Sequence, residues 1–288
     1  MGTAHDVAGH VVVGVDGSET SVRAVDWAAD QARLEKRPLT LLHAATLGTL
    51  AGLDVDTRTI SAAMQADGRA VLHRAHERAA EHGVGSVHSD LVLDDPRTVL
   101  LDASRHAHLL VVGSRGRGPV SSLLLGSVSV ALTQHARCPV VVCRPGAPPE
   151  SGRGVLVATD GLRHSEPAVE WGARLAESRG WPLVLVRTVF DGRPPSRVPP
   201  DSGEHDEAWT HLRAVERQVC HLHPSLDLSL RVERGLSDEA IIRAATGMDV
   251  VVLGPHARRS IAGILDLDVT KSLVERAPCL VAVVPPRD

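Results

Sequence analysis

The sequence is poor in aromatic residues and in lysine. Its 288 residues include no tyrosine and one phenylalanine, and aromatics make up 2% of the chain. Proteins that hold single-stranded nucleic acids usually stack bases on aromatic side chains, so this composition argues against such a partner. The two lysines, Lys36 and Lys271, do not follow a glycine-rich loop, which excludes a Walker-type phosphate loop. A GxSxG nucleophile elbow is also missing, which removes the usual serine-hydrolase arrangement.

Charge runs and long apolar runs are missing as well. The formal net charge is −4, from 31 basic and 35 acidic residues mixed along the chain, so no basic stripe predicts nucleic-acid binding. No apolar run approaches the roughly 18 residues of a membrane-spanning helix, and the first residues do not resemble a signal peptide. We therefore expect no membrane partner and a cytoplasmic location. Hydrophobic residues, at 43%, are ample for a packed core.

Cysteine and histidine are present without the spacings of a disulfide framework or a metal site. No CxxC pair occurs, so the four cysteines are predicted to be reduced and mostly buried. The histidine groups match neither HExxH nor a zinc pattern, so we expect no metal site and treat them as solvated or partly buried. These residues are Cys138, Cys143, Cys220 and Cys279, and His73 and His76 beside Glu77, His106 with His108, and His221 with His223.

Apolar runs and amphipathic stretches alternate through the first half of the chain. Short continuous apolar runs are typical of strands buried on both faces of a parallel sheet, and residues 10–16, 39–45, 87–93, 109–112 and 139–143 have this character. Helical patterns lie between them, at residues 18–32, 61–82, 96–104 and 128–135. The expected count is five strands and four helices.

The second half repeats the first. A stretch rich in Pro, Gly and Ser at residues 144–154 marks a linker, after which the pattern of residues 11–30 returns at residues 155–174. Asp16, Ser21 and Trp27 correspond to Asp160, Ser165 and Trp171 at one constant offset of 144, which indicates a true internal repeat. We predict two domains, at residues 1–146 and 154–288. Trp27 and Trp171 are interpreted as packing anchors between helix and sheet.

The alternation predicts an α/β protein with two tandem doubly wound domains of Rossmann-like topology. Each domain would be a five-stranded parallel sheet with helices on both faces, because right-handed crossovers lay their helices on the sheet. Ligands of such sheets bind beyond the carboxyl ends of the strands, where the strand order reverses. If the first and fourth strands are neighbours, Asp16 and the loop at Gly113 flank one crevice.

The stretch from Leu109 to Gln134 joins a buried strand, a glycine-rich loop and a helix, which is what a phosphate chain needs. Glycines at 113, 116 and 118 let the backbone approach a ligand. Ser127 is a good N-cap for the helix, whose first free N–H groups would face an anion.

These residues resemble the universal stress proteins, and the whole chain resembles their tandem form. The resemblance rests on VVVGVDGS in the first strand, on LLHA in the second, and on the motif G-x2-G-x9-G-S/T, present as Gly113, Gly116, Gly126 and Ser127 and followed by a helix and CPVVV. It implies ATP binding in the first domain, with Mg²⁺ as an accompanying ion.

Carried over position by position, the resemblance implies a role for each part of the motif. Asp16 would contact the ribose, with Gly14 and Val15 on the base side and the backbone of Ala44 at the adenine edge. Arg115 and Arg117 add positive charge nearby, although either could be a solvated loop side chain. The ribose and phosphates would be held by Val112, Gly113, Ser114, Arg115 and Gly116, and the phosphate chain at the helix start by Gly126, Ser127, Val128 and Ser129.

The second half departs from this motif. Gly254 is retained, but Ala257 replaces the second glycine, and Leu267 and Asp268 replace the Gly–Ser pair. An aspartate at a helix start would repel phosphate, so we predict no ATP binding of this kind there. Asp160 is retained, and a strand-end aspartate is more often a turn or helix cap than a ligand contact.

The sequence favours a nucleotide-binding regulatory protein that senses or carries adenine nucleotide with little or no turnover, acting through an unknown protein partner. No general base aimed at a phosphate is identifiable, so we assign no catalytic residue. The alternative is an ATP-using enzyme, either a slow ATPase or a protein that phosphorylates itself, for instance at Ser121 or Ser122. The repeat also predicts an intramolecular pseudo-dimer, and a further homodimer stays open.

Overall fold

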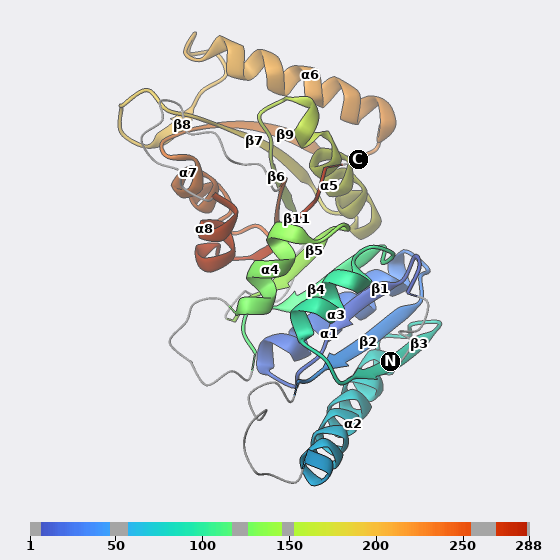
Figure 1. Cartoon of the computed structure of the whole chain (residues 1–288). Helices are drawn as coiled ribbons and strands as arrows, with labels where there is room; N and C mark the ends of the chain where they lie inside the picture. The colour runs from blue at the N-terminus through green and yellow to red at the C-terminus, as the bar shows by residue number, and fades with distance from the viewer. Residues whose placement is uncertain (1–6, 47–56, 117–125, 146–152, 255–268, 287–288) are drawn as a thin grey trace. The chain divides into compact units, whose positions relative to one another are not determined.

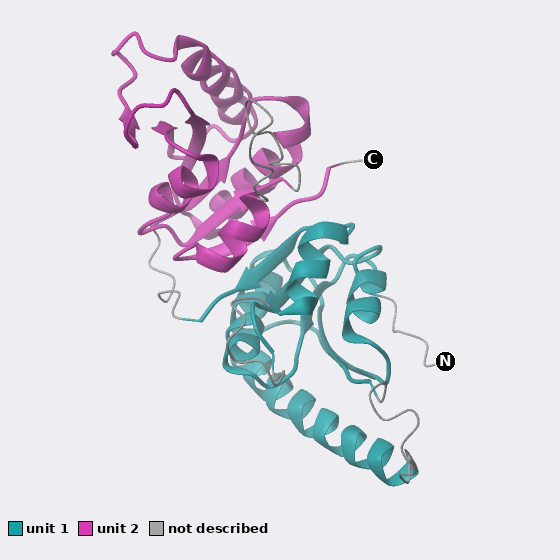
Figure 2. Cartoon of the chain, turned by 60° about the vertical axis from the view of Figure 1, so that its left-hand side comes forward, with its two compact units in different colours: residues 1–145 teal, residues 146–288 magenta. Residues whose placement is uncertain are grey.

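The computed structural model describes residues 7–46, 57–116, 126–145, 153–254 and 269–286. The chain divides into two compact units, Met1–Pro145 and Gly146–Asp288, which are coloured separately in Figure 2. Each unit is a layered α/β structure in which the described helices lie against a sheet (Figure 1).

The first unit contains the expected alternation of strands and helices. Helix α2 begins at Thr57, a few residues before the start at residue 61 that the sequence pattern predicts. In order along the chain, the elements are β1 (Val11–Gly14), α1 (Glu19–Leu34), β2 (Leu39–Ala44), α2 (Thr57–Glu81), β3 (Val87–Val92), α3 (Pro96–Ala103), β4 (Leu109–Gly113), α4 (Ser127–His135) and β5 (Val140–Cys143).

The sheet of the first unit is parallel, with the strand order β3-β2-β1-β4-β5. The chain therefore builds outward from β1 to β3 and then crosses back to β4 on the other side of β1. Right-handed crossovers running in opposite directions place their helices on opposite faces, so α1 and α2 pack together on one face and α3 and α4 on the other. The central strands β1 and β4 are apolar because both faces of the sheet are covered there, and Val11, Val12 and Val13 are fully buried, whereas the edge strand β3 carries exposed polar residues.

The second unit repeats this plan and adds one strand. The extra strand β8 has three residues and pairs antiparallel with β9 at the edge of the sheet. In chain order, the elements are β6 (Val155–Ala158), the 3₁₀ turn η1 (Arg163–Ser165), α5 (Glu166–Arg179), β7 (Leu183–Val189), β8 (Ser196–Val198), α6 (Asp206–Leu222), β9 (Leu228–Arg234), α7 (Ser237–Ala244), β10 (Val250–Leu253), α8 (Val269–Arg276) and β11 (Leu280–Val283).

Five of these strands form the predicted parallel sheet, in the order β11-β10-β6-β7-β9. Strand β8 departs from the sequence expectation, since it is short and lies between prolines, which predicts a loop. Its pairing depends on the chain that folds back over β9, with Arg197 opposite Glu233. A three-residue edge strand of this kind has no periodic signal of its own.

Both predicted tryptophan anchors are buried. Trp27 on α1 is 4% exposed and Trp171 on α5 is 5% exposed. Each helix packs on the first strand of its own unit, and on α5 the close approach is tight: a Cβ on Gly172 would lie 2.4 Å from Val157 Cγ2. The repeat seen in the sequence is therefore a repeat of helix-on-sheet packing.

Candidate functional site

Strands β1 and β4 are neighbours, as the crevice hypothesis requires. They pair in parallel with Val11 opposite Leu109 and Val13 opposite Val111. The strand order reverses between them, because β1 leads toward β2 on one side while β4 leads toward β5 on the other. The carboxyl ends of these two strands carry Asp16 and the loop from Gly113 to Gly116, which therefore lie at the topological switch point of the sheet.

The turn after β1 holds Asp16 at the start of α1. Gly17 has a φ of +78°, a left-handed conformation that lets the chain turn directly into the helix. The Ser18 N–H donates to Asp16 Oδ1 at 2.9 Å, and Ser18 caps α1 by accepting from the Ser21 N–H at 3.3 Å. The half-buried Asp16 carboxylate is thus oriented by the turn that it helps to form.

The loop after β4 is tied to the start of α1 by two hydroxyl groups. Ser18 Oγ and Thr20 Oγ1 both donate to the Arg115 carbonyl oxygen, at 3.2 and 2.7 Å. The Ser114 N–H donates to the carbonyl of Cys143 at 2.7 Å, and the Ser114 side chain is 1% exposed. Within the described parts of the chain, Ser114 Oγ has no hydrogen-bond partner.

Sequence reasoning missed the contributions of Ser18 and Thr20. The signal lay in the stretch DGSET, whose serine is a typical N-cap. The pattern indicates a helix start, but it does not indicate that the same hydroxyls reach a carbonyl almost a hundred residues away.

Gly113 and Gly116 bring the loop close to α1 and to Asp16. A Cβ on Gly113 would lie 2.5 Å from Thr20 Oγ1 and 3.0 Å from the Ser21 backbone nitrogen, where no real Cβ fits. A Cβ on Gly116 would lie 2.5 Å from Asp16 Oδ2. The second glycine of the motif therefore passes directly over the carboxylate, which a residue with a side chain could not do without a shift.

Helix α4 begins next to this loop. Its N-cap residue is Gly126, with φ −78° and ψ 147°, and no side chain of the described residues caps it. The expectation that Ser127 is the N-cap is wrong by one position, because Gly126 is the residue with extended backbone and Ser127 already has helical geometry. Ser127 is exposed and Val128 is half-buried at this end of the helix.

The remaining part of the motif holds the loop together. The Gly126 N–H donates to the Ser114 carbonyl at 2.8 Å, and Ser129 Oγ donates to the Gly113 carbonyl at 2.8 Å. Ser129 is buried, so its hydroxyl links the helix to the loop in this structure. A helix start with uncapped N–H groups beside a glycine loop is a favourable place for an anion.

The other predicted positions lie near the switch point or in the sheet beneath it. Gly14 and Val112 are adjacent in the core, where a Cβ on Gly14 would lie 3.2 Å from Val112 Cγ1. Val15 is buried, and Ala44 is half-buried at the end of β2, opposite Val92 of β3. Arg115 is half-buried. Gly118, Arg117, Ser121 and Ser122 lie outside the described residues.

The turn at Asp160, which corresponds to the Asp16 turn, has different contacts in the second unit. Asp160 Oδ1 accepts from the Leu162 N–H at 3.0 Å, and Asp160 Oδ2 pairs with His164 Nε2 at 2.9 Å. This is the turn-capping role that the sequence favoured for Asp160. Gly254 has more room than Gly113, since its Cβ would lie 3.7 Å from the His164 carbonyl. The substituted positions Ala257, Leu267 and Asp268 lie outside the described residues.

Some histidines of the groups named above lie beside carboxylates. His73 Nδ1 lies 3.3 Å from Glu77 Oε2, and His223 Nδ1 lies 2.8 Å from Glu177 Oε2. In the described part of the chain, no three His, Cys, Asp or Glu side chains gather as a metal site would require. No described helix is both long and apolar enough to cross a membrane.

Two α/β repeats, each wound on both faces of its sheet, with a glycine loop at the switch point of the first, define the class of this protein. The model of the universal stress protein family matches residues 8–144 and 153–285, one match for each unit. The chain belongs to the universal stress protein family.

Relatives match along nearly the full chain. A universal stress protein of Mycolicibacterium smegmatis is 31% identical over 96% of this chain and 97% of its own length. One from Mycobacterium tuberculosis is 31% identical over 94% of this chain and 96% of its own. The tandem arrangement therefore recurs in these relatives.

Solved structures share the fold at lower identity. A universal stress protein from Archaeoglobus fulgidus is 19% identical, with a TM-score of 0.74 over 98% of this chain and 99% of that one. Another, described as a putative universal stress protein from Pseudomonas aeruginosa, is 17% identical, with a TM-score of 0.61 over 98% of this chain and 94% of that one.

Proposed function

We propose that the first unit binds ATP in the crevice between the Asp16 turn and the Gly113–Gly116 loop. The observation that carries this proposal is the position of Gly116, whose missing side chain lets the loop lie against Asp16 Oδ2, where a Cβ would be only 2.5 Å from that oxygen. A carboxylate suits the ribose hydroxyls, and uncapped N–H groups at the start of α4 suit phosphate oxygens. One crevice thus offers an acceptor for the sugar and donors for the phosphates.

Other residues near this site also suit a nucleotide, at its base and at its phosphates. In this proposal Val15 and the backbone of Ala44 would face the base, and the half-buried Arg115 would add positive charge at the loop. Mg²⁺ would accompany the phosphates and neutralise part of their charge. The contacts of Asp160 support the assignment of a single site. Its Oδ1 accepts from the Leu162 N–H and its Oδ2 pairs with His164, so both carboxylate oxygens have partners within the second unit.

Binding with little or no turnover fits these residues best. Asp16 is assigned to the sugar and also accepts a hydrogen bond from Ser18, so it is poorly suited to act as a base toward a phosphate. The nucleotide would act by ordering the loop and so changing the surface offered to a protein partner, a population shift that needs no chemistry.

The test is to denature the purified protein and identify any released nucleotide, and then to measure ATP affinity by calorimetry. Asp16→Asn is expected to weaken ATP binding by about tenfold or more, which corresponds to ~1.4 kcal/mol. The matched control is Asp160→Asn at the repeat-equivalent position, which should leave ATP affinity unchanged. A protein that carries no nucleotide and does not bind added ATP would contradict the proposal.

Turnover is measured separately with the same protein. ATP incubated with a stoichiometric amount of protein for hours should remain ATP, apart from the background found in buffer. Release of ADP or AMP above that background would favour the alternative of an ATP-using enzyme, and mass spectrometry of the protein would detect transfer of phosphate to a serine.

A further inference from the structure

The peptide group between Val15 and Asp16 is held at both ends by side chains. His43 Nδ1 lies 2.6 Å from the Val15 carbonyl oxygen, and the Asp16 N–H donates to Ser21 Oγ at 3.1 Å. Since both bonds act on the same planar group, they fix the rotation of that plane. The direction of the Asp16 N–Cα bond is fixed with it, and the bond from the Ser18 N–H to Asp16 Oδ1 at 2.9 Å then limits the rotation of the side chain about that bond.

His43 can make this bond in one way only. A carbonyl oxygen accepts and never donates, so Nδ1 of the ring must carry the hydrogen. The side chain is 7% exposed and stands on β2, the strand that already receives the Val15 N–H through the Leu42 carbonyl at 2.9 Å. Val15 is therefore bonded to β2 through both its N–H and its carbonyl oxygen.

Helix α2 leaves space for this imidazole at Gly68. A Cβ on Gly68 would lie 2.8 Å from His43 Cδ2 and 2.6 Å from Leu91 Cδ1. A glycine inside a helix costs about 1 kcal/mol relative to alanine, so its presence calls for a packing reason. The ring of His43 is clamped between the backbone of α2 and the carbonyl that it holds. In the second unit, the position of α6 that corresponds to Gly68, counted from the C-terminal end of the helix, is Trp209. The glycine is therefore specific to the first unit.

The second unit shows what the same positions do where the aspartate pairs with a histidine. Arg187 stands at the repeat position of His43, and its Nη1 donates to the Asp160 carbonyl at 2.5 Å, one peptide further along. Ser165, the counterpart of Ser21, donates to the Leu162 carbonyl at 2.8 Å. In both units a side chain of the second strand bonds a carbonyl of the turn. In the first unit that carbonyl belongs to Val15, and Ser21 accepts from the N–H of the same peptide group, a combination that the second unit does not have among its described residues.

We propose that His43 is a positioning residue for the nucleotide site: through Val15 it sets the Asp16 carboxylate in the orientation that recognises the ribose. This inference rests on the proposed function. His43 acts through the backbone and is not assigned a contact with the ligand.

The test compares two substitutions that place an amide at different ends of the imidazole. His43→Asn puts its NH₂ near the position of Nδ1 and keeps the donor to Val15, whereas His43→Gln reaches toward Nε2 and loses it. ATP and 2′-deoxy-ATP affinities are measured by calorimetry for both variants, together with unfolding in urea. Both variants lose the packing of the imidazole ring, so the free energy of unfolding of each variant measures the effect of that loss on the fold.

We expect His43→Asn to bind ATP within about threefold of the wild type and to keep the preference for ATP over 2′-deoxy-ATP. His43→Gln should lose about tenfold in ATP affinity and most of that preference, because the mispositioned carboxylate no longer recognises the sugar. Gly68→Ala should act in the same direction by displacing the ring. Arg187→Gln is the matched control in the second unit and should leave both affinities unchanged.

The outcomes separate the two proposals. If the wild type binds no adenine nucleotide, the proposed function fails and this inference fails with it. If the wild type prefers ATP over 2′-deoxy-ATP and His43→Gln keeps that preference at full affinity, the positioning role of His43 alone is overturned. Equal losses in His43→Asn and His43→Gln that follow their losses of stability would assign His43 to packing and would also overturn it.

Discussion

At the residue scale, glycines and small hydroxyls decide how the site is built. The loop of the first unit passes within reach of Asp16 because Gly113 and Gly116 have no side chains, and its Arg115 carbonyl is held by Ser18 and Thr20. Where a side chain would meet backbone atoms, the chain itself must shift, so these glycines are sensitive positions.

The first residue-scale prediction concerns Gly116→Ala. The new methyl group would meet Asp16 Oδ2 at 2.5 Å and turn the carboxylate away from the loop, so ATP affinity should fall about tenfold or more. Gly85→Ala is the control, because a Cβ there has no neighbour within 4 Å. Calorimetric titration with ATP checks both variants, and unchanged affinity in Gly116→Ala would count against the placement of the loop over the carboxylate.

A second prediction at this scale concerns thiol reactivity. Burial raises the pKa of Cys138 to about 12, and Cys143 and Cys279 are also buried, whereas Cys220 is exposed on α6. The thiolate is the reactive form, so iodoacetamide at about pH 8 should label Cys220 in the native protein and the other three only after unfolding. Peptide mass spectrometry before and after addition of urea checks this, and native labelling of Cys138 would contradict it.

At the element scale, helices α1 and α2 are joined by charges rather than by apolar contact alone. Arg78 is bonded to Asp26 through two nitrogens, and His82 at the end of α2 lies 3.2 Å from Asp26 and 3.0 Å from Asp30. In the second unit, the position of α6 that corresponds to Arg78, counted from the C-terminal end of the helix, is the apolar Val219. The two helix pairs are therefore held differently.

This ion-pair cluster predicts a pH-dependent contribution to stability. Burial alone would lower the pKa of His82, but its bonds to Asp30 and Asp26 raise it above the ordinary 6.5. A raised histidine pKa stabilises the fold fully below the unfolded-state pKa, and the contribution is lost as pH rises through the folded-state pKa. His82→Gln should therefore cost about 0.5 to 1 kcal/mol near pH 5.5 and little near pH 8.5, as these groups are partly exposed.

Urea unfolding of the wild type and of His82→Gln at the two pH values measures this difference. Titrations that both proteins share cancel in the comparison. His73→Gln is the control, because His73 is mostly exposed and, within the described residues, its carboxylate partner is Glu77 of its own helix. A cost that does not change with pH, or one that grows toward alkaline pH, would show that His82 contributes by packing and not by charge.

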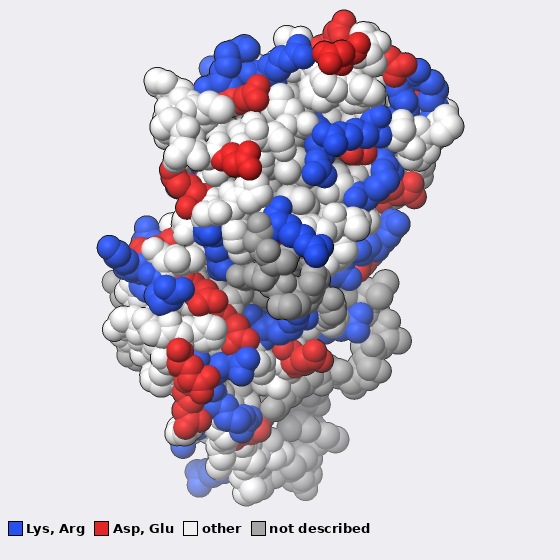
Figure 3. Space-filling model, turned by 180° about the vertical axis from the view of Figure 1, so that it is seen from behind, with Lys and Arg blue, Asp and Glu red and all other residues white. Residues whose placement is uncertain are grey.

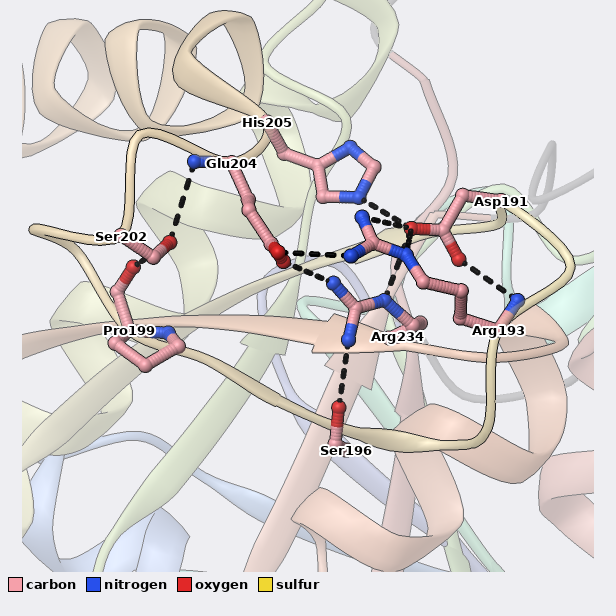
Figure 4. Close-up of polar contacts among 8 residues, drawn as sticks. All are labelled: Asp191, Arg193, Ser196, Pro199, Ser202, Glu204, His205 and Arg234. Atoms are coloured by element: carbon pink, nitrogen blue, oxygen red, sulfur yellow. Dashed lines mark hydrogen bonds and ion pairs between the residues drawn. The ribbon is translucent and has the colours of Figure 1, made fainter.

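At the scale of the whole molecule, two repeats of one plan have acquired different loops. Acidic and basic side chains are interspersed over the face drawn in Figure 3, in keeping with the small net charge. In the second unit, the chain between β7 and α6 is fastened by an ionic network in which Arg234 bonds Asp191 at 3.0 Å and also bonds Glu204, while Arg193 pairs with the same two carboxylates (Figure 4).

The network gives this loop a dependence on acid. Burial opposes ionisation of Asp191, but the Arg193 N–H and the side chains of His205 and Arg193 hold its pKa well below the usual value of 3.8. A depressed carboxyl pKa contributes stability above the unfolded-state pKa, and that contribution is lost as pH falls toward the folded-state pKa. At neutral pH the loop should therefore be fully fastened.

Arg234→Gln is predicted to release the loop of the second unit without affecting the first. Arg234 is 8% exposed and contacts both carboxylates, so its removal leaves them with Arg193 as their arginine partner among the described residues. Trypsin should then cut after the exposed Arg197 at neutral pH severalfold faster, while ATP affinity stays unchanged. Arg174→Gln, which removes an exposed pair with Glu170, is the control and should not change cleavage. Unchanged cleavage in Arg234→Gln would contradict the proposed fastening.

The sequence by itself determined the repeat, the order of strands and helices apart from β8, and the family. These features are local or periodic: apolar runs such as Val11–Val13, the Gly–Ser pair at 126–127, and the constant offset between Asp16 and Asp160 can be recognised without any long-range contact. It also predicted the switch point, because a doubly wound sheet admits few strand orders.

Only the tertiary structure decided how the turns at the switch point are supported. The bonds from Ser18 and Thr20 to Arg115, the grip of His43 on Val15, and the space left by Gly68 join residues that are distant in the chain. The pairing of β8 with β9 likewise depends on a loop folding back. Such contacts carry no periodic signal, because each depends on distances that are fixed only when the sheet and its helices have packed.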